Sequence, residues 1–558
     1  MLVIAVVQGI LLFSLYRAFD ANFWPSESPL WSYPLWTLAI AVPLLLLLSL
    51  SRGNEKRVVQ LVALFAGVLA LLAIYTGWQA KPFGEFPLWG LSFAFTCSIT
   101  LACFKALMYL QQRADRVPLT YQVLFTNSWR NFLVTALSAI FVLIFWLILL
   151  LWGELFRVIK IDFFRDLFRE DWFIFPVLGF ALGLGVIIFR NLTRVIDNIT
   201  KLLHGLIKLL LPLIVAVAVI FLAALPIVGL DVLWSTGRGT ALLLWLLAVM
   251  LFFTNAVYQD GRETNPYPPI IHRLIFSGLC VMPIVSALSL YGLVLRLNQY
   301  GWSVERCWAF VVWLILTLIA VGYVVGIVRR RTEWTSDLAR VNSGMGLVVL
   351  ALMLLANSPV LDFRKISLSS QRHRVESGEI ELREFDFWYT KQNLARPGYL
   401  AMEDMKEQVG DSDLDLRELI TNPVNKWQAQ RMRDNDDMWA NMTYRPEPFE
   451  VPESLHNFIA KQYYGGDQGE YVMIQLDLDA DNQSEYLLFN LQGNRIARSQ
   501  LFYLTDDGWK NGFLSNPGWR YGGEATKDKI MEGKIEIVDP RFRHVEIGGV
   551  LMQPATSN

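Results

Sequence analysis

Residues 131–153 of the chain read NFLVTALSAIFVLIFWLILLLWG, and none of them is Asp, Glu, Lys or Arg. A helix of about 20 predominantly apolar residues is long enough to cross the hydrocarbon core of a bilayer. The stretch therefore predicts a transmembrane helix. The segments on either side of it indicate that this helix is one of many.

Similar apolar runs recur along the first two thirds of the chain. We expect eleven spans, at residues 2–19, 34–51, 58–78, 88–110, 131–153, 173–190, 205–229, 239–258, 273–296, 304–328 and 341–359. The first run lacks the charged leading region and the small-residue cleavage site of a signal peptide, so we expect it to stay in the membrane. The sequence thus predicts an all-α polytopic membrane domain over residues 1–359.

The composition divides the chain at the same place. Of its 558 residues 54% are hydrophobic and 18% are charged, whereas a soluble protein has about 25% charged residues. Residues 1–359 carry 26 basic and 17 acidic side chains, and residues 360–558 carry 23 basic and 33 acidic ones. The net charge of −1 is therefore the sum of a basic membrane part and an acidic, water-soluble part.

The soluble part, residues 360–558, combines helical and strand patterns. A helix is expected around 374–408, and runs typical of short strands occur at 470–478, 485–490, 495–504, 534–537 and 543–552. Turn sequences such as Asp507-Gly508 separate some of these runs. We expect an α+β domain with a small antiparallel sheet.

Basic residues are concentrated in alternate loops between the expected spans. Fifteen Lys and Arg lie in loops 51–57, 111–130, 190–204, 259–273 and 329–340, against about nine in the other loops. Loops rich in Lys and Arg tend to stay in the cytoplasm. The N-terminus is therefore expected inside the cell, and an odd number of spans places residues 360–558 outside. In a bacterium this topology describes an inner-membrane protein with a periplasmic C-terminal domain.

The segment between the fifth and sixth spans has apolar residues at helical spacing. Val158, Ile161, Phe164 and Phe168 recur along it, with most of its charged residues on other faces. This pattern is typical of an amphipathic helix that lies in the membrane interface. We expect such a helix near residues 157–172, the alternative being a polar loop that contains aromatic residues.

An acidic loop in the soluble part has the spacing of a cation site. Asp477, Asp479, Asp481 and Glu485 occupy positions 1, 3, 5 and 9 of a stretch that leads into an expected strand. Calcium binds six to eight oxygen ligands in flexible geometry, so carboxylates at this spacing are candidate Ca²⁺ ligands. The spacing is similar to that of the calcium loops of integrin-like propellers. The alternative is a solvated acidic turn without a metal.

The turn between the ninth and tenth spans is unusually polar for its place. Its candidate functional residues are Arg296, Tyr300, Trp302, Glu305 and Arg306. Ser303 can cap the tenth helix, and Glu305 suits the positive end of that helix. Helix capping therefore accounts for part of the pattern. The remainder is a candidate ligand or interdomain site beneath the periplasmic domain.

Several function classes find no support in the sequence. It contains no phosphate-binding GxxxxGK[ST] loop, no HExxH and no GxSxG, and its five histidines are scattered. The acidic soluble part disfavours a nucleic-acid partner. The expected spans contain no carboxylate near their centres, which disfavours proton- or sodium-coupled transport. The four cysteines lie in or beside apolar runs and are expected to be free thiols.

The chain resembles an uncharacterised family of polytopic inner-membrane proteins of Gram-negative bacteria, whose members are loosely labelled permeases. The resemblance rests on Asn255–Gly261, Arg296, Tyr300–Trp302, Glu305-Arg306, Arg396–Tyr399, Asp477–Glu485, Asp539–Arg543 and Ile547–Gly549. It implies a many-span membrane domain followed by an extracytoplasmic domain. It implies no activity.

Three functions are consistent with these features. The leading interpretation is a non-enzymatic protein whose periplasmic domain binds an envelope partner or ligand, with membrane lipid around its spans. The first alternative is a permease for a small solute or lipid. The second is a lipid-linked glycosyltransferase-like enzyme, for which Asp20 and Glu27 are the candidate outward carboxylates. The sequence does not indicate an oligomeric state.

Overall fold

A computed structural model of the chain describes most of its residues. The described part comprises residues 1–558 except 236, 259–265, 331–333, 411–412, 425–437, 448–449, 463–468, 493–494, 506–507, 515–523, 538–544, 548–549 and 553–558. It divides into two compact units, Met1–Pro423 and Val424–Asn558.

Among the described residues of the first unit, eleven helices are long and apolar enough to cross a membrane, as the sequence predicts. They are α1 (Leu2–Asp20), α2 (Pro29–Ser49), α3 (Glu55–Gln79), α4 (Trp89–Ala114), α5 (Tyr121–Val158), α7 (Asp171–Asn191), α8 (Thr193–Val228), α10 (Gly239–Tyr258), α11 (Pro269–Tyr300), α12 (Val304–Arg330) and α13 (Trp334–Leu355). A short helix, α9 (Leu230–Ser235), follows α8. The chain is therefore a polytopic membrane protein.

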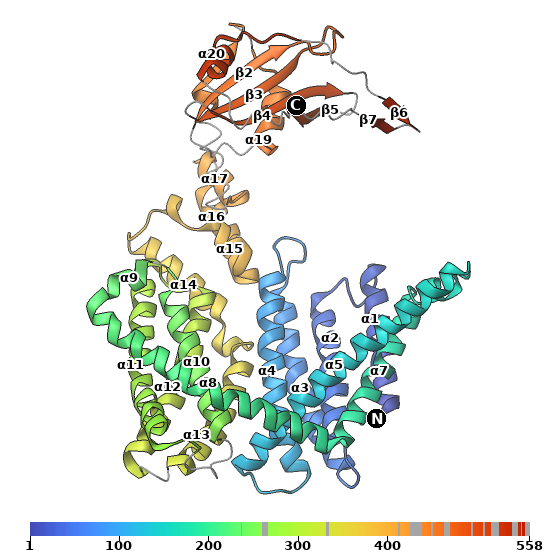
Figure 1. Ribbon diagram of the computed structural model, residues 1–558, viewed down its shortest axis with the longest axis vertical. Helices are drawn as coiled ribbons and strands as arrows, with labels where there is room; N and C mark the ends of the chain where they lie inside the picture. Colours follow the sequence, from blue (N-terminus) through green and yellow to red (C-terminus); the bar gives the residue numbers. More distant parts are fainter. Residues whose placement is uncertain are drawn as a thin grey trace. The chain divides into compact units, whose positions relative to one another are not determined.

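These helices form two packed groups (Figure 1). One apolar core joins α1–α5 and α7 with the start of α8, and a second joins α8 with α10–α13. Close helix approach requires small residues within each group: a Cβ on Gly179 of α7 would lie 2.6 Å from the carbonyl oxygen of Ala5 on α1. Helices α4 and α13 connect the groups, and the Tyr109 hydroxyl donates to the Ser343 carbonyl at 2.9 Å.

The helix expected near residues 157–172 is largely absent. Helix α5 continues to Val158, and only the five-residue helix α6 (Phe163–Leu167) precedes α7. Lys160 has a φ of 63°, a left-handed conformation that interrupts a helix. The aromatic residues of the segment pack back onto α5 instead, with the Phe156 and Phe164 rings 4.6 Å apart. Phe164 and Phe168 therefore pack on α5, whereas Val158 and Ile161 are exposed.

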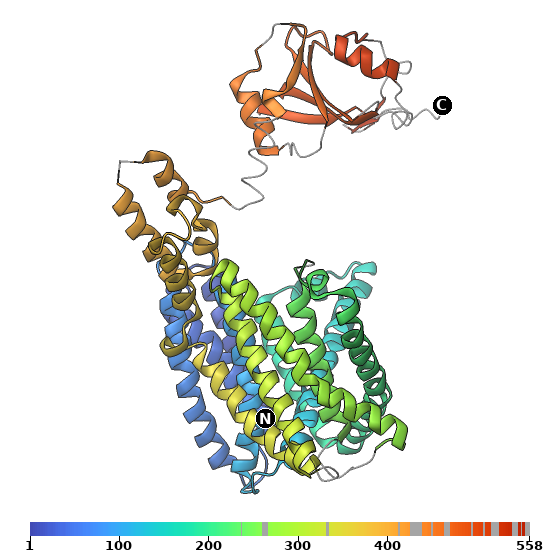
Figure 2. The same ribbon diagram turned by 90° about the vertical axis from the view of Figure 1, so that its left-hand side faces the viewer.

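A group of short helices follows the last span and belongs to the same compact unit. We call this group the platform: η2 (Pro359–Leu361), α14 (Phe363–Glu376), η3 (Leu382–Glu384), α15 (Phe387–Asn393), α16 (Ala395–Val409) and α17 (Leu414–Thr421). Figures 1 and 2 show the platform at one end of the membrane helices. The composition changes at residue 359, but the compact units divide after Pro423, because the polar platform helices contact α3, α4 and α12.

The second unit contains a five-stranded sheet in the order β1-β2-β3-β4-β5. Its strands are β1 (Met442–Arg445), β2 (Glu470–Leu476), β3 (Glu485–Gln492), β4 (Arg495–Thr505) and β5 (Gly508–Phe513). Strand β1 is parallel to β2, and the other neighbours are antiparallel. A separate hairpin joins β6 (Val545–Ile547) and β7 (Val550–Met552). The predicted α+β class is confirmed.

Each face of the sheet has its own apolar core, as strand alternation requires. Tyr471 and Met473 of β2 pack with Leu455 and Ile459 of α19 (Glu453–Gln462). Their neighbours on the opposite face pack with Ile530 of α20 (Glu524–Glu532). The expected strand at 534–537 is not formed, and β1 and β5 were not expected.

Candidate functional site

The polar turn between α11 and α12 is the contact surface for α14. The Trp302 amide donates to the Ser370 hydroxyl at 3.0 Å, and the Ser367 hydroxyl donates to the Trp302 carbonyl at 3.2 Å. The Gln371 side chain donates to the carbonyls of Tyr300 and Trp302 at 2.8 and 3.1 Å. Helix α14 therefore binds mainly the backbone of this turn, so the segment after the last span is fixed to the membrane helices.

Tyr389 of α15 makes a second contact with the same turn. Its hydroxyl accepts from the Val304 amide at 2.9 Å and donates to the Glu305 carboxylate at 3.1 Å. Burial raises the pKa of Tyr389, with a further contribution from Glu305, so the hydroxyl stays protonated and can donate. The predicted role of Glu305 at the helix end is thus combined with a contact to the platform.

The two arginines of the turn flank the Tyr300 ring. The guanidinium carbons of Arg296 and Arg306 lie 5.8 and 5.4 Å from the ring centre. Arg306 also donates to the Gly301 carbonyl at 2.7 Å, and its amide donates to the Ser303 hydroxyl. The structure thus brings the five residues predicted from this turn together at a contact between membrane helices and platform. The contacts with the platform and within the turn account for the polar character of these residues without a bound ligand.

A buried carboxylate forms the centre of a second contact between α3 and the platform. Asp362 is 4% exposed. Its carboxylate accepts from the Tyr75 hydroxyl at 2.7 Å and from the side-chain amide of Gln79 at 2.5 Å. It also caps α14 by accepting from the Arg364 amide at 3.0 Å. Burial lowers the pKa of the Arg364 guanidinium, and the charge of Asp362 offsets this effect. Sequence reasoning did not find this cluster, although an Asp directly after the last span was a visible signal.

The Arg396–Tyr399 motif forms the third contact. The Arg396 guanidinium lies over the Trp78 ring, 4.8 Å from its centre, and donates to the Lys81 carbonyl at 3.3 Å. The Tyr399 ring lies 6.1 Å from that of Phe86. A Cβ on Gly398 would lie 2.4 Å from the Thr390 carbonyl oxygen, so only glycine fits there. This motif therefore holds α16 against the loop between α3 and α4.

The Asn255 motif contributes to a polar cluster inside the membrane part. Asn342 of α13 donates to the Tyr121 hydroxyl and to the Asn255 side chain, both at 3.0 Å, and accepts from Tyr323 at 2.8 Å. The Tyr121 hydroxyl also donates to Asn255. The four side chains come from α5, α10, α12 and α13, so the cluster joins both helix groups. Residues 259–261 of the motif lie outside the described residues.

A large apolar cavity lies between α2, α4 and α5. Its volume is about 690 Å³. Hydroxyl groups line it alongside apolar side chains, including those of Tyr33, Ser92 and Thr100, and the described residues around it include no charged side chain. The Tyr33 and Ser92 hydroxyls bond to each other at 2.6 Å, which leaves the wall largely apolar. The cavity suits an acyl chain or an apolar solute, not an ion.

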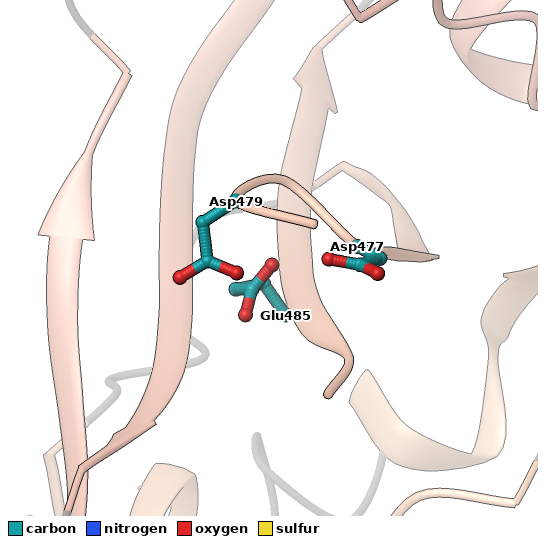
Figure 3. Close-up of side chains that lie close together, drawn as sticks. All are labelled: Asp477, Asp479 and Glu485. Carbon is teal, nitrogen blue, oxygen red and sulfur yellow. The ribbon is translucent and has the colours of Figure 1, made fainter. Parts of the chain in front are cut away.

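The acidic loop brings three of its four predicted ligands together (Figure 3). Oxygen atoms of Asp477, Asp479 and Glu485 lie within 4.8 Å of one another, whereas Asp481 is outside this group. The Asp481 carboxylate instead accepts from the backbone amide of Gln483 at 2.6 Å.

Two residues of this loop that are not glycine have a left-handed backbone conformation. Ala480 and Asn482 have φ values of 61° and 64°, which places both in the left-handed region. Asn adopts this region more readily than Ala does, because its side chain can hydrogen-bond locally. The carboxylates accept backbone amides of the turn, as in the bond from Asn482 to Asp477 at 3.2 Å. The arrangement could hold a hard cation, and whether it does so stays a prediction.

Glu485 is the most buried member of this group, at 7% exposure. Burial raises the pKa of its carboxyl, the Leu478 amide at 2.6 Å opposes the rise, and the neighbouring aspartates add to it. The three carboxylates therefore repel one another, and a bound cation would relieve that repulsion.

The carboxylates considered for a glycosyltransferase are at the surface. Asp20 ends α1 and forms an exposed ion pair with Arg17 at 3.7 Å. Glu27 is also exposed, and neither residue lines the apolar cavity. The structure therefore does not bring these two acids into a pocket.

The family comparison matches the unit that holds these contacts. The model of the family described as "Domain of unknown function (DUF4153)" matches residues 5–405. The chain belongs to this family. No curated protein and no solved structure matches the chain. The match covers the eleven spans and most of the platform. The motif residues 539–543 and 548–549 lie outside both this match and the described residues.

Proposed function

We propose that the protein is a non-enzymatic inner-membrane protein that holds its second unit in the periplasm for binding an envelope partner or ligand. The observation that carries the proposal is the attachment of the platform to α3, α11 and α12 through Asp362 and the 300–306 turn. A rigid attachment of this kind fixes where the chain leaves the membrane part. It serves a protein that presents a binding unit.

The positive-inside distribution of Lys and Arg supports the orientation in this proposal. Loop 51–57 and the end of α12 at Arg329 and Arg330 lie at the end of the bundle opposite the platform, as the order of the helices requires, and both carry basic residues. In this proposal the platform end is the periplasmic end, and the unit after Pro423 is on the same side of the membrane.

A reporter enzyme that is active only in the periplasm, fused after Asn558, tests the orientation. We expect activity from this fusion and none from a control fusion after Arg329, which lies in the last turn of α12 at the opposite side. Photo-crosslinking from exposed Leu504 and Phe513 tests partner binding. A discrete adduct with an envelope protein is expected, and a photo-crosslinker at exposed Lys56, at the opposite end of the bundle, should not give it. Activity of the Arg329 fusion alone would contradict the proposal.

The cavity between α2, α4 and α5 favours a second candidate, a permease for a lipid or apolar solute. A volume of about 690 Å³ with an uncharged lining accommodates a large part of a lipid tail. Reconstitution into liposomes with a fluorescent lipid analogue tests this function. Protein-dependent movement of the lipid between leaflets, reduced by Ala136→Trp in the cavity wall, supports it. Absence of movement in both proteins excludes it for that lipid.

A further inference from the structure

A second cavity, of about 550 Å³, lies where α5 and α8 meet at the end of the bundle opposite the platform. We call it the basic pocket. Its charged and aromatic lining residues are Trp129, Arg130, Asp197, Lys201, His204 and Lys208. Among the described residues that line the pocket there are three basic side chains and one carboxylate, so the lining they form is basic. It is separate from the platform contacts and from the apolar cavity.

His204 gives the pocket a buried polar group without a partner. The residue is 8% exposed, and its Nε2 atom has no hydrogen-bond partner among the residues that the structure describes. The rings of Trp129 and Phe125 hold the imidazole, at centre distances of 4.6 and 5.6 Å. A buried polar atom without a partner is costly. A ligand oxygen in the basic pocket would remove this cost.

Arg130 lies at the pocket with its charge in place. It donates one hydrogen bond to the Arg190 carbonyl at 3.0 Å, and this bond does not neutralise the guanidinium. An arginine has further N–H groups that fit phosphate oxygens, and lysine binds phosphate as a point charge. The charge of Arg130 is therefore available to an anion.

The position of the basic pocket corresponds to the membrane interface. Helices α5 and α8 contain 38 and 36 residues, so each exceeds the roughly 20 residues that a bilayer core requires. The sequence predicted loops at residues 111–130 and 190–204, at the ends of membrane spans. The charged and aromatic residues of the pocket lie in these two segments or within one helical turn of them. Figure 1 shows α8 crossing the bundle obliquely. Lipid headgroups lie at this depth.

Exposed leucines beside the basic pocket provide a surface for acyl chains. Leu202, Leu206 and Leu209 of α8 are 64%, 50% and 76% exposed. Residues spaced three and four apart share one helix face. The same stretch of α8 therefore presents cations to the pocket and an apolar face to its surroundings. A soluble anion would use only the first of these features.

We propose that the basic pocket binds the phosphate headgroup of an anionic phospholipid, with its acyl chains along the leucine face of α8. Arg130 and Lys201 bind the phosphate, and the Nε2 atom of His204 hydrogen-bonds to a headgroup oxygen or hydroxyl. The shared chemistry is that of any phosphate, but the leucine face selects a lipid. Pockets of basic residues between transmembrane helices are suited to anionic lipid headgroups.

Native mass spectrometry of the full-length protein in detergent tests the proposal. Phosphatidylglycerol is compared with phosphatidylcholine of the same acyl chains, and inorganic phosphate is added in a separate arm. We expect phosphatidylglycerol to bind at least tenfold more tightly than phosphatidylcholine. Lys201→Gln should weaken its binding about fivefold. Lys56→Gln removes an exposed lysine that does not line the basic pocket and is the matched control; it should leave binding unchanged.

Each outcome decides the proposal. Equal binding of the two lipids, or equal losses in Lys201→Gln and Lys56→Gln, would overturn it. Thermal stabilisation by inorganic phosphate alone that matches the effect of phosphatidylglycerol would assign the pocket to a soluble phosphate and overturn the lipid assignment. Binding of phosphatidylglycerol to the His204→Gln protein is measured in the same experiment. Lys201 is exposed, so the Lys201→Gln result is informative whether or not the His204→Gln protein folds.

Discussion

At the scale of single residues, the structure separates polar groups that hold the fold from groups that could bind a ligand. Asp362, Tyr389 and Arg396 have protein partners that account for them. Asp477, Asp479 and Glu485 form a group in which like charges converge. His204 has an unpartnered nitrogen in a cavity. We therefore expect substitutions of Asp362, Tyr389 and Arg396 to change stability. We expect substitutions in the carboxylate group or at His204 to change binding.

Asp362→Asn should destabilise the protein by about 1–3 kcal/mol, because it removes the charge beside Arg364 and places an amide donor against two other donors. Thermal unfolding of the purified full-length variant measures the effect. Asp404→Asn is the control, since its ion pair with Arg372 is at the surface and is worth at most about 1 kcal/mol. Equal melting temperatures of the two variants would contradict the role of Asp362.

Calcium should bind the group of three carboxylates. When its free concentration is ten times its dissociation constant, a cation that binds only the folded state adds about 1.4 kcal/mol to the free energy of unfolding. Glu485→Gln should abolish this gain, whereas Asp481→Asn should retain most of it, because Asp481 lies outside the group. Calorimetric titration of the full-length protein and its two variants measures binding. Absence of heat from the wild-type protein would exclude the site.

The pH dependence of this group follows from Glu485. Burial raises the pKa of its carboxyl in the folded protein. The folded state then holds a proton on Glu485 more tightly than the unfolded state does. The stability that this proton contributes is fully present below about pH 4.3, the ordinary pKa of Glu, and is lost as pH rises through the raised pKa of the folded state. Without calcium, Glu485→Gln should be more stable than the wild type at pH 7, and this difference should disappear below pH 4. A constant difference across this range, measured by thermal unfolding, would contradict this account.

At the scale of elements, the platform is held by helix packing as well as by hydrogen bonds. Gly398→Ala places a Cβ 2.4 Å from the Thr390 carbonyl oxygen and should separate α16 from α15. We expect faster proteolysis between residues 377 and 423 and a loss of roughly 1–3 kcal/mol. Gly344→Ala is the control, because a Cβ there meets nothing within 4 Å and alanine favours a helix. Equal proteolysis rates would show that this packing is unimportant.

The sequence predicted elements well where one physical property determines them. The eleven spans follow from length and hydropathy alone, and the structure confirms them. The 157–172 segment shows where this fails, since its apolar spacing predicts a helix along the segment and the structure forms only the five residues of α6 there. The Asp362 cluster was missed because its partners lie 283 and 287 residues away in the chain. Contacts between distant segments leave no local pattern in one sequence.

At the scale of the whole molecule, the position of the unit boundary has a direct consequence. A chain that ends at Pro423 keeps the platform and should insert and remain monodisperse in detergent. A chain that ends at Asn357 loses Asp362 and exposes the 300–306 turn, and it should aggregate or be degraded. Expression level and size-exclusion profiles of the two truncations measure this difference. Similar behaviour of both would show that the platform is not part of the membrane unit.

The proposed function depends most on the side of the membrane to which the second unit is exposed. In a variant lacking its four native cysteines, single cysteines at Asp479 and Lys56 are treated in intact spheroplasts with a maleimide that cannot cross membranes. We predict labelling of the Asp479→Cys protein before lysis and of the Lys56→Cys protein only after lysis. Labelling of Lys56→Cys in intact spheroplasts, with Asp479→Cys protected until lysis, would contradict the proposed topology and the periplasmic binding function with it.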